Sequence, residues 1–236
     1  MSKYQIIYQD LLNKIKKGEI KANTYLPSEN ELMKIYEASR DTIRKSLNLL
    51  LQNGYIQKNK GKGSLVLDFE RIAFPVSGVT SFKELEKIMH GDVKTHVHVF
   101  LQSEVSEEMK KHLYMDHGSM YHIERIREID GEKVILDIDY LNGEVIKGLK
   151  LEHAQNSLYA YIEKELGLKI SFAKKEITVV KATDKEKELL DMNEYDLLVC
   201  VKSYTYLDDA TLFEYTISKH RPDKFRFVDF ARRTEL

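Results

Sequence analysis

The sequence predicts an α+β protein of two domains, with helices and a short hairpin in the first and an antiparallel sheet in the second. Three observations support this. At 236 residues the chain is long for one domain and natural for two. Residues 1–68 carry 12 Lys and Arg against 7 Asp and Glu, whereas the remainder carries 25 against 31. Beyond residue 80, paired strand patterns joined by turn residues recur, as is typical of an antiparallel sheet.

The N-terminal domain, residues 1–68, begins with an amphipathic helix pattern, MSKYQIIYQDLLNKIKKG. Ser28 is expected to begin a second helix, since Glu31 three positions later completes a capping box. Ser39 is expected to cap a third helix. This helix buries an apolar row at i, i+4 and i+7 that starts at Ile43, and Asn53-Gly54 ends it. The predicted layout is therefore helix, tight turn, helix.

A hairpin follows the third helix. Residues 55–58 and 64–67 form its strands, and the tip at 59–63 is basic and rich in glycine. Two helices joined by a turn and followed by such a hairpin make a winged helix-turn-helix, in which the second helix presents its first turns to a DNA major groove. Arg40, Asp41, Thr42 and Arg44 crowd those turns. The alternative is a winged helix used only for contacts with protein.

The string LPSENEL…SRDTIRKSL…GYI…GKGS resembles the DNA-binding domain of GntR-type bacterial transcription regulators. The resemblance implies a homodimer on a palindromic, double-stranded operator, with the wing in the minor groove. Asn30 departs from the pattern, since many members carry arginine there. The DNA-contacting residues that the resemblance implies are Ser28, Glu29, Ser39, Arg40, Thr42, Arg44, Lys62 and Gly63.

A linker is predicted over residues 69–80, where Pro75, Ser77 and Gly78 interrupt any regular period. The C-terminal domain, residues 81–236, opens with a helix that runs from a Ser81–Glu84 capping box to about residue 89. We expect the helices of this domain to lie on one face of its sheet. The remaining patterns predict strands over 94–105, 120–130, 133–141, 170–181, 197–207, 212–219 and 225–230, and helices over 106–113, 157–166 and 184–190.

One strand carries an unusual pattern. In residues 120–130 the odd positions are the apolar ones, yet Arg125 and Arg127 stand among them. Two neighbouring guanidinium groups on a core-facing row need anionic partners. Asp137 and Asp139 on the next strand are one possibility. A ligand phosphate is the other, since two arginines at i, i+2 can converge on one tetrahedral anion. Spacing alone does not separate the two.

Beyond residue 70 the chain resembles the effector-binding (UTRA) domain of the HutC branch of GntR regulators, which is related in fold to chorismate lyase. The carriers are FPVSGVTSFKEL, ERIREIDGEKVILDIDYL, NSLYAYIEKELGLKISFAKKEI and SKHRPDKFRFVDFARR. The first, third and last resemble trehalose-operon repressors, whose inducer is trehalose 6-phosphate. The resemblance implies that Thr80, Ser81, Phe82, Arg125, Arg127, Ser157 and Tyr159 hold the phosphate and Asp137 contacts the sugar, with Glu214, Tyr215 and His220 as further candidates.

The expected function is a repressor of a trehalose operon that trehalose 6-phosphate releases, or the same kind of regulator responding to another phosphosugar such as glucosamine 6-phosphate. An enzyme like chorismate lyase is a less favoured alternative, because fold similarity does not carry chemistry. The chain has no P-loop, no nucleophile elbow and no set of metal ligands at binding spacing, so no cofactor or metal is expected. Its single Cys200 and the lack of a long apolar stretch favour a cytoplasmic protein without a membrane segment.

Overall fold

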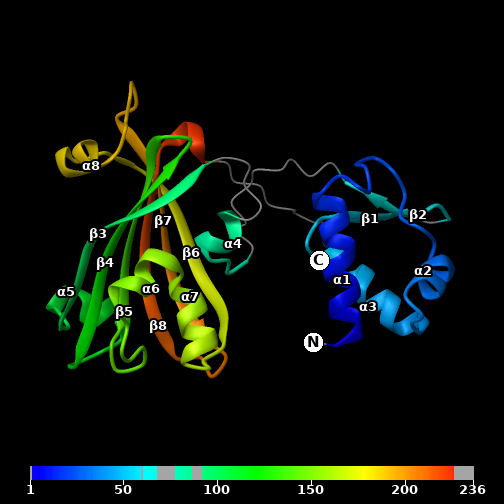
Figure 1. Cartoon of the computed structure of the whole chain (residues 1–236), viewed down its shortest axis with the longest axis horizontal. Coiled ribbons are helices and arrows are strands. Elements are labelled where there is room, and N and C mark those ends of the chain that lie inside the picture. Colours follow the sequence, from blue (N-terminus) through cyan, green and yellow to red (C-terminus); the bar gives the residue numbers. More distant parts are fainter. Residues whose placement is uncertain (1, 60, 68–77, 87–91, 226–236) are drawn as a thin grey trace, which may run out of the picture. The chain divides into compact units, whose positions relative to one another are not determined.

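The computed structural model describes residues 2–59, 61–67, 78–86 and 92–225. These residues form two compact units, one within 2–67 and one within 78–225 (Figure 1). Most of the expected linker lies outside the described residues, as does the expected strand beyond residue 225. No helix in the described part of the chain has both the length and the apolar character needed to cross a membrane.

The first unit is a winged helix-turn-helix, as predicted. Its helices are α1 (Lys3–Lys16), α2 (Glu29–Ile35) and α3 (Arg40–Gln52). Strands β1 (Ile56–Asn59) and β2 (Gly63–Val66) pair antiparallel, and an isolated bridge joins Tyr25 to Leu65. The capping predictions also hold, because Ser28 and Glu31 form a complete capping box and the Ser39 side chain accepts from the Thr42 backbone N–H.

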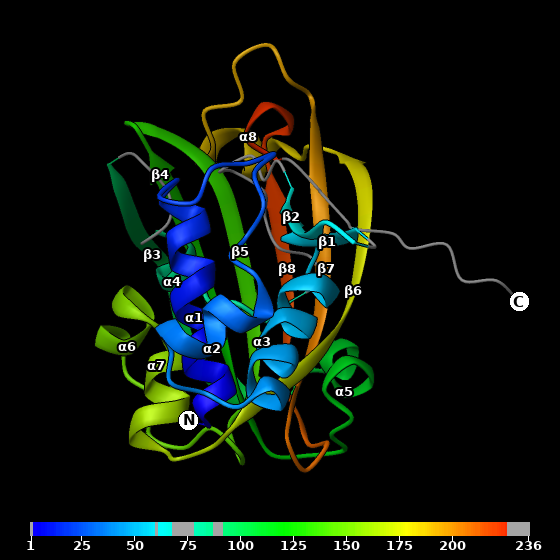
Figure 2. The same ribbon diagram turned by 90° about the vertical axis from the view of Figure 1, so that its right-hand side faces the viewer.

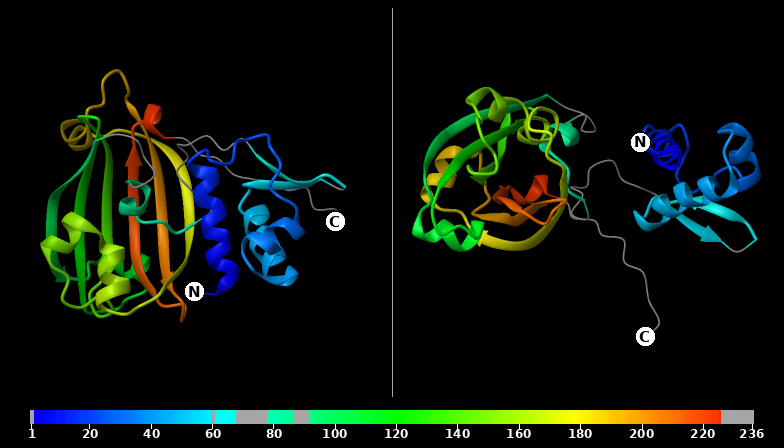
Figure 3. Two further views of the ribbon diagram at one scale, coloured as in Figure 1. Left: turned by 45° about the vertical axis from the view of Figure 1, so that its right-hand side comes forward. Right: turned by 90° about the horizontal axis from the view of Figure 1, so that it is seen from below.

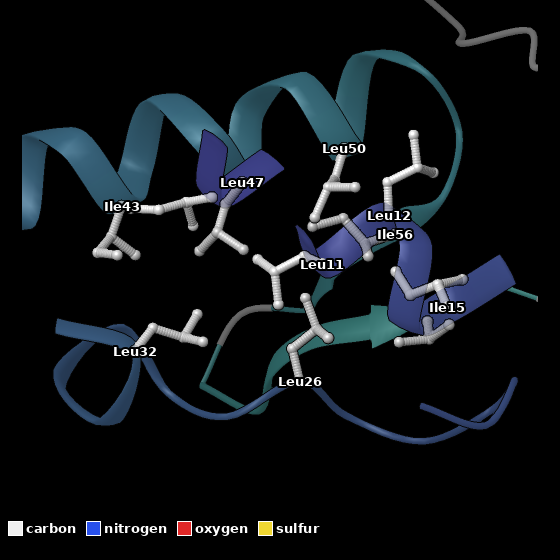
Figure 4. Close-up of a cluster of buried hydrophobic side chains, with 11 residues drawn as sticks. Leu11, Leu12, Ile15, Leu26, Leu32, Ile43, Leu47, Leu50 and Ile56 are labelled. Atoms are coloured by element: carbon white, nitrogen blue, oxygen red, sulfur yellow. The ribbon is translucent and has the colours of Figure 1, made fainter. Parts of the chain in front are cut away.

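The core of this unit fixes the orientation of α3. Ile43, Leu47 and Leu50, the predicted row, are each at most 1 % exposed, and they pack among side chains of α1, α2 and β1 (Figure 4). Ser46 is also buried, and its hydroxyl donates to the Tyr4 carbonyl at 2.8 Å, which ties α3 to α1. With one face of α3 held in this way, its opposite face remains at the surface.

The second unit contains a six-stranded antiparallel sheet in the order β3-β4-β5-β8-β7-β6 (Figure 2). The sheet is strongly curved (Figure 3). The predicted hairpins are present as β4–β5 and β7–β8, and the pairing of β5 with β8 joins them. The strands are β3 (Val93–Glu104), β4 (Ser119–Ile129), β5 (Glu132–Asn142), β6 (Ile170–Lys181), β7 (Leu197–Leu207) and β8 (Leu212–His220).

The helices of this unit agree with the predictions in part. The predicted 157–166 helix starts on the Ser157 cap, but it runs as a short α-helix followed by a π-helical turn. A helix before it, α6, was not predicted, and of the predicted 81–89 helix the structure describes the part up to Glu86. The helices are α4 (Phe82–Glu86), α5 (Glu107–Leu113), α6 (Leu151–Asn156), α7 (Leu158–Ala160) with its π-turn (Tyr161–Glu165), α8 (Asp184–Leu189) and a 3-10 turn (Pro222–Lys224).

The expectation that the helices cover one face of the sheet is wrong. Residues of α6 and α7 pack with Tyr121 and Ile123 of β4. Two residues of α5 pack with Met120, and the segment at the end of α8 packs with Ile126. Met120 and Ile126 belong to the other face of β4. Because side chains alternate along a strand, helices cover both faces. The even-numbered row of β4 therefore includes buried residues, among them Glu124, which pairs with Lys185 of α8.

Candidate functional site

The first candidate site is the exposed face of α3. Arg40 and Arg44 are both exposed and stand one helical turn apart, so they project from the same side of the helix. Thr42 lies between them and is half-buried, and its hydroxyl is 2.9 Å from that of Ser39. This surface has the charge and spacing of a recognition helix.

The second helix and the wing stand beside α3 in the same unit. Asn30, which departs from the family pattern, accepts a hydrogen bond from Arg40 Nη2 at 2.9 Å. Asn30 thus links α2 to α3, a contact that the sequence did not predict. Glu29 begins α2 after the Ser28 cap and is half-buried. At the wing, Lys62 is exposed and Gly63 has φ of +101°, a conformation that favours glycine.

The second candidate site is a pocket in the C-terminal unit. Its floor comes from β4, β5, β7 and β8, and segments at the starts of α4 and α7 contribute to its wall. Ten of the eleven residues that the sequence suggested for effector binding line it: Thr80, Ser81, Phe82, Arg125, Arg127, Asp137, Ser157, Tyr159, Glu214 and His220.

Tyr215 is the exception, because it is not among the residues that line the pocket. It is adjacent to Glu214 on β8, and neighbouring residues of a strand face opposite sides of the sheet. Its ring packs on the far face with Met109 and Leu113 of α5, and it stacks on His112 with 4.3 Å between ring centroids. Tyr215 therefore contributes to packing behind the sheet and does not line the pocket.

The two arginines of the pocket are paired with the two aspartates. Arg125 donates to Asp139 Oδ2 from Nε at 3.0 Å and from Nη2 at 2.7 Å. Arg127 donates from Nε to Asp137 Oδ2 at 2.8 Å and from Nη1 to Thr95 at 2.7 Å. Burial, and then the Arg125 charge, lower the pKa of Arg127 to about 10, so it still carries its charge at neutral pH. The carboxylate partners considered from the sequence are thus present.

The acidic residues of the pocket differ in their protonation. Burial opposes ionisation of Asp137, but the charges of Arg127 and Arg125 outweigh it and hold the pKa of Asp137 below its usual value. Glu214 is 2 % exposed, and burial together with the nearby charge of Asp139 raises its pKa to about 7. The Tyr159 hydroxyl donates to Glu214 Oε2 at 2.9 Å. Glu214 can therefore act as a donor or an acceptor near neutral pH.

The other predicted residues supply neutral hydrogen-bonding groups and an aromatic wall. Burial lowers the pKa of His220 to about 4, so its ring is neutral at pH 7, and Nε2 lies 2.8 Å from the Ser218 hydroxyl. Ser81 forms the predicted capping box with Glu84 at the start of α4. The Phe82 ring covers the Arg127 guanidinium, whose central carbon is 4.3 Å from the ring centroid.

Sequence reasoning missed several residues that line the pocket. Thr216 and Ser218 alternate with Glu214 and His220 along β8, and this polar row was a readable signal of an inward-facing strand face. Lys175 of β6 had no such signal, since it lies between other polar residues on an edge strand. Asn156 and Ser203 also line the pocket and were not singled out.

A winged helix-turn-helix in the same chain as a domain with a polar, charged pocket is the architecture of a ligand-responsive transcription regulator. Residues 3–66 match the family described as bacterial regulatory proteins, gntR family, and residues 89–226 match the UTRA domain. The chain belongs to the GntR family of bacterial transcription regulators, with a DNA-binding N-terminal domain and a UTRA effector-binding domain.

The chain is also similar to individual transcription regulators and to solved structures of this family. The chain is 50 % identical to the HTH-type transcriptional regulator TreR of Bacillus subtilis (strain 168), over 99 % of this chain and 98 % of that protein. The solved effector-binding domain of the B. subtilis trehalose repressor is 48 % identical and has a TM-score of 0.55, covering 60 % of this chain and 99 % of that domain. The structure of B. subtilis YydK, a possible transcriptional regulator, is 26 % identical with a TM-score of 0.82, over 98 % and 100 % of the two chains.

Proposed function

We propose that this protein represses a trehalose-utilisation operon and leaves its operator when trehalose 6-phosphate occupies the pocket. The observation that carries the proposal is the pocket itself, in which buried arginines and helix-opening serines surround acidic and neutral hydrogen-bonding groups. The similarity of the protein to a trehalose repressor over nearly the whole chain supports trehalose 6-phosphate as the ligand.

The pocket residues suit the two parts of such a ligand. Guanidinium N–H groups of Arg125 and Arg127 can donate to phosphate oxygens, as can the hydroxyls of Ser81 and Ser157. Sugar hydroxyls both donate and accept, so they need partners of both kinds. Asp137 is an acceptor, and Glu214, with its pKa near neutrality, serves in either role. Apolar atoms of Phe82 can cover the sugar ring.

The DNA-binding part of the proposal rests on α3 and the wing. Arg40, Thr42 and Arg44 face the major groove in this reading, Ser28, Glu29 and Ser39 approach the phosphate backbone, and the Lys62-Gly63 tip enters the minor groove. A homodimer places two such units on half-sites about 34–36 Å apart in a palindromic operator. Induction then requires two arrangements of the dimer, one that binds the operator and one that does not. The ligand must bind the second arrangement more tightly than the first.

A gel-shift experiment with the full chain and the promoter DNA of its trehalose genes tests the proposal. We expect a shifted protein–DNA complex that dissociates when trehalose 6-phosphate is added. Trehalose and glucosamine 6-phosphate should leave the complex intact. In parallel, trehalose 6-phosphate at 100 times its Kd should stabilise the protein by about 2.7 kcal/mol in thermal unfolding.

Each other outcome points to a defined alternative. Release by glucosamine 6-phosphate instead of trehalose 6-phosphate would assign the protein to another phosphosugar. Chemical turnover of a bound sugar phosphate, detected as a change in its phosphorus NMR signal, would favour an enzyme. Failure of every sugar phosphate to release the operator would reject the proposed inducer class.

A further inference from the structure

The positive charges that line the pocket are not equally available to a ligand. Among the described residues, four lysine and arginine side chains line it, and three of them pair with carboxylates. Arg125 and Arg127 bind the aspartates of β5, and Lys83 Nζ lies 2.8 Å from Glu86 Oε1. The fourth is Lys175, and within the described residues no carboxylate lies at ion-pair distance from its ammonium group.

Lys175 is instead held by a neutral group. It is half-buried in the middle of β6, and Nζ donates to the Gly78 carbonyl oxygen at 2.7 Å. Burial lowers the pKa of Lys175, which indicates that its surroundings do not compensate the charge. An ammonium group has three N–H donors, and this hydrogen bond uses one of them.

The Gly78 contact places this ammonium group beside the expected phosphate subsite. Val79, Thr80, Ser81 and Phe82 follow Gly78 directly and line the pocket. Because consecutive Cα atoms are about 3.8 Å apart, the Cα atoms of Gly78 and Ser81 are at most about 11 Å apart. Lys175 and Ser81 also line the same pocket, so both can approach an anion bound there.

We propose that Lys175 supplies the uncompensated positive charge that draws the effector's phosphate into the pocket. This inference rests on the proposed function, since it names a residue for the same ligand. A phosphate ester carries about −1.5 to −2 charges at pH 7. Arginines committed to buried carboxylates offer it little net charge, and taking them away would strand those carboxylates. Lys175 can turn to the phosphate without leaving an unpaired acid behind.

Calorimetric titration of trehalose 6-phosphate into the full-length protein tests the role of Lys175. Lys175→Met removes the charge and keeps most of the apolar length. Since a hydrogen bond to a charged group is being lost, we expect the Kd to rise by about 10- to 150-fold. Lys175→Arg keeps the charge and should recover most of the affinity. Lys174→Met is the matched control, because Lys174 is an exposed neighbour on the other face of β6 and should bind like the wild type.

The outcomes separate this inference from the proposed function. Operator binding and the melting temperature of each variant without ligand establish that it is folded. If the wild type binds trehalose 6-phosphate and Lys175→Met binds it within about twofold, the role of Lys175 is rejected and the proposed inducer stands. Equal losses in Lys175→Met and Lys175→Arg would show that charge is not the cause and would also overturn it. If the wild type binds no sugar phosphate, both the role of Lys175 and the proposed inducer are rejected.

Discussion

Substitution of Arg127 by methionine tests whether the buried ion pairs hold the sheet together. Arg127 is 2 % exposed and hydrogen-bonds to Asp137 and Thr95, with the Phe82 ring over its guanidinium. Methionine fills much of the volume but leaves Asp137, itself 8 % exposed, without its closest cation. Removal of one partner of a buried pair costs about 3–5 kcal/mol, because the other charge stays buried and uncompensated.

Hydrogen–deuterium exchange of the full chain measures this cost where it occurs. At about 1.4 kcal/mol per factor of ten, the protection of β4 and β5 amides should fall by roughly two to nearly four powers of ten. Peptides from α1 belong to the other compact unit and serve as an internal control, with unchanged protection expected. In the double variant Arg127→Met/Asp137→Asn both charges are gone, so much of the lost protection should return.

Two results would refute this reasoning. Unchanged protection of β4 in Arg127→Met would mean that Asp137 is satisfied without the arginine and that the pair is dispensable for the fold. A double variant as unprotected as the single one would mean that lost packing, and not the stranded carboxylate, causes the effect. Normal protection combined with loss of trehalose 6-phosphate binding would instead assign Arg127 to the ligand alone.

Three further predictions address the DNA-binding face, the protonation of the pocket and the far side of the sheet. Arg44→Ala should weaken operator binding by about 1–3 kcal/mol in gel shifts, and unchanged affinity would remove Arg44 from the set of DNA-contacting residues. Lys62→Ala should weaken binding to all DNA alike and reduce the slope of log K against log salt by about one. Because folding raises the pKa of Glu214 from 4.5 to about 7, the folded state binds the proton more tightly, so its contribution to the unfolding free energy falls as pH rises through that window. Glu214→Gln should thus be more stable than the wild type at pH 8 by up to about 3 kcal/mol, and by much less at pH 5, in urea unfolding; an equal difference at both pH values would contradict the raised pKa. Tyr215→Ala should lower stability by about 3–5 kcal/mol without changing the Kd for the effector in the folded protein, and a specific loss of affinity would return Tyr215 to the pocket.

The sequence determined the features that depend on neighbouring residues. Ser28, Ser39 and Ser81 marked the starts of three helices because a cap is a hydrogen bond within one turn. The row beginning at Ile43 fixed the buried face of α3, so the exposed arginines followed from helical period alone. The apolar row of β4 interrupted by Arg125 and Arg127 likewise indicated a polar site inside the C-terminal unit. Resemblance to a family then supplied most of the other pocket residues.

The tertiary structure decided what depends on contacts between distant segments. Whether the arginines meet aspartates is a matter of strand register, and the structure sets Arg125 opposite Asp137 while its side chain reaches diagonally to Asp139. The far-side position of Tyr215 depends on the registration of β8 beside β5. Lys175 meets Gly78 across 97 residues. No local pattern encodes such a contact, because it exists only once the curved sheet has brought both segments to one pocket.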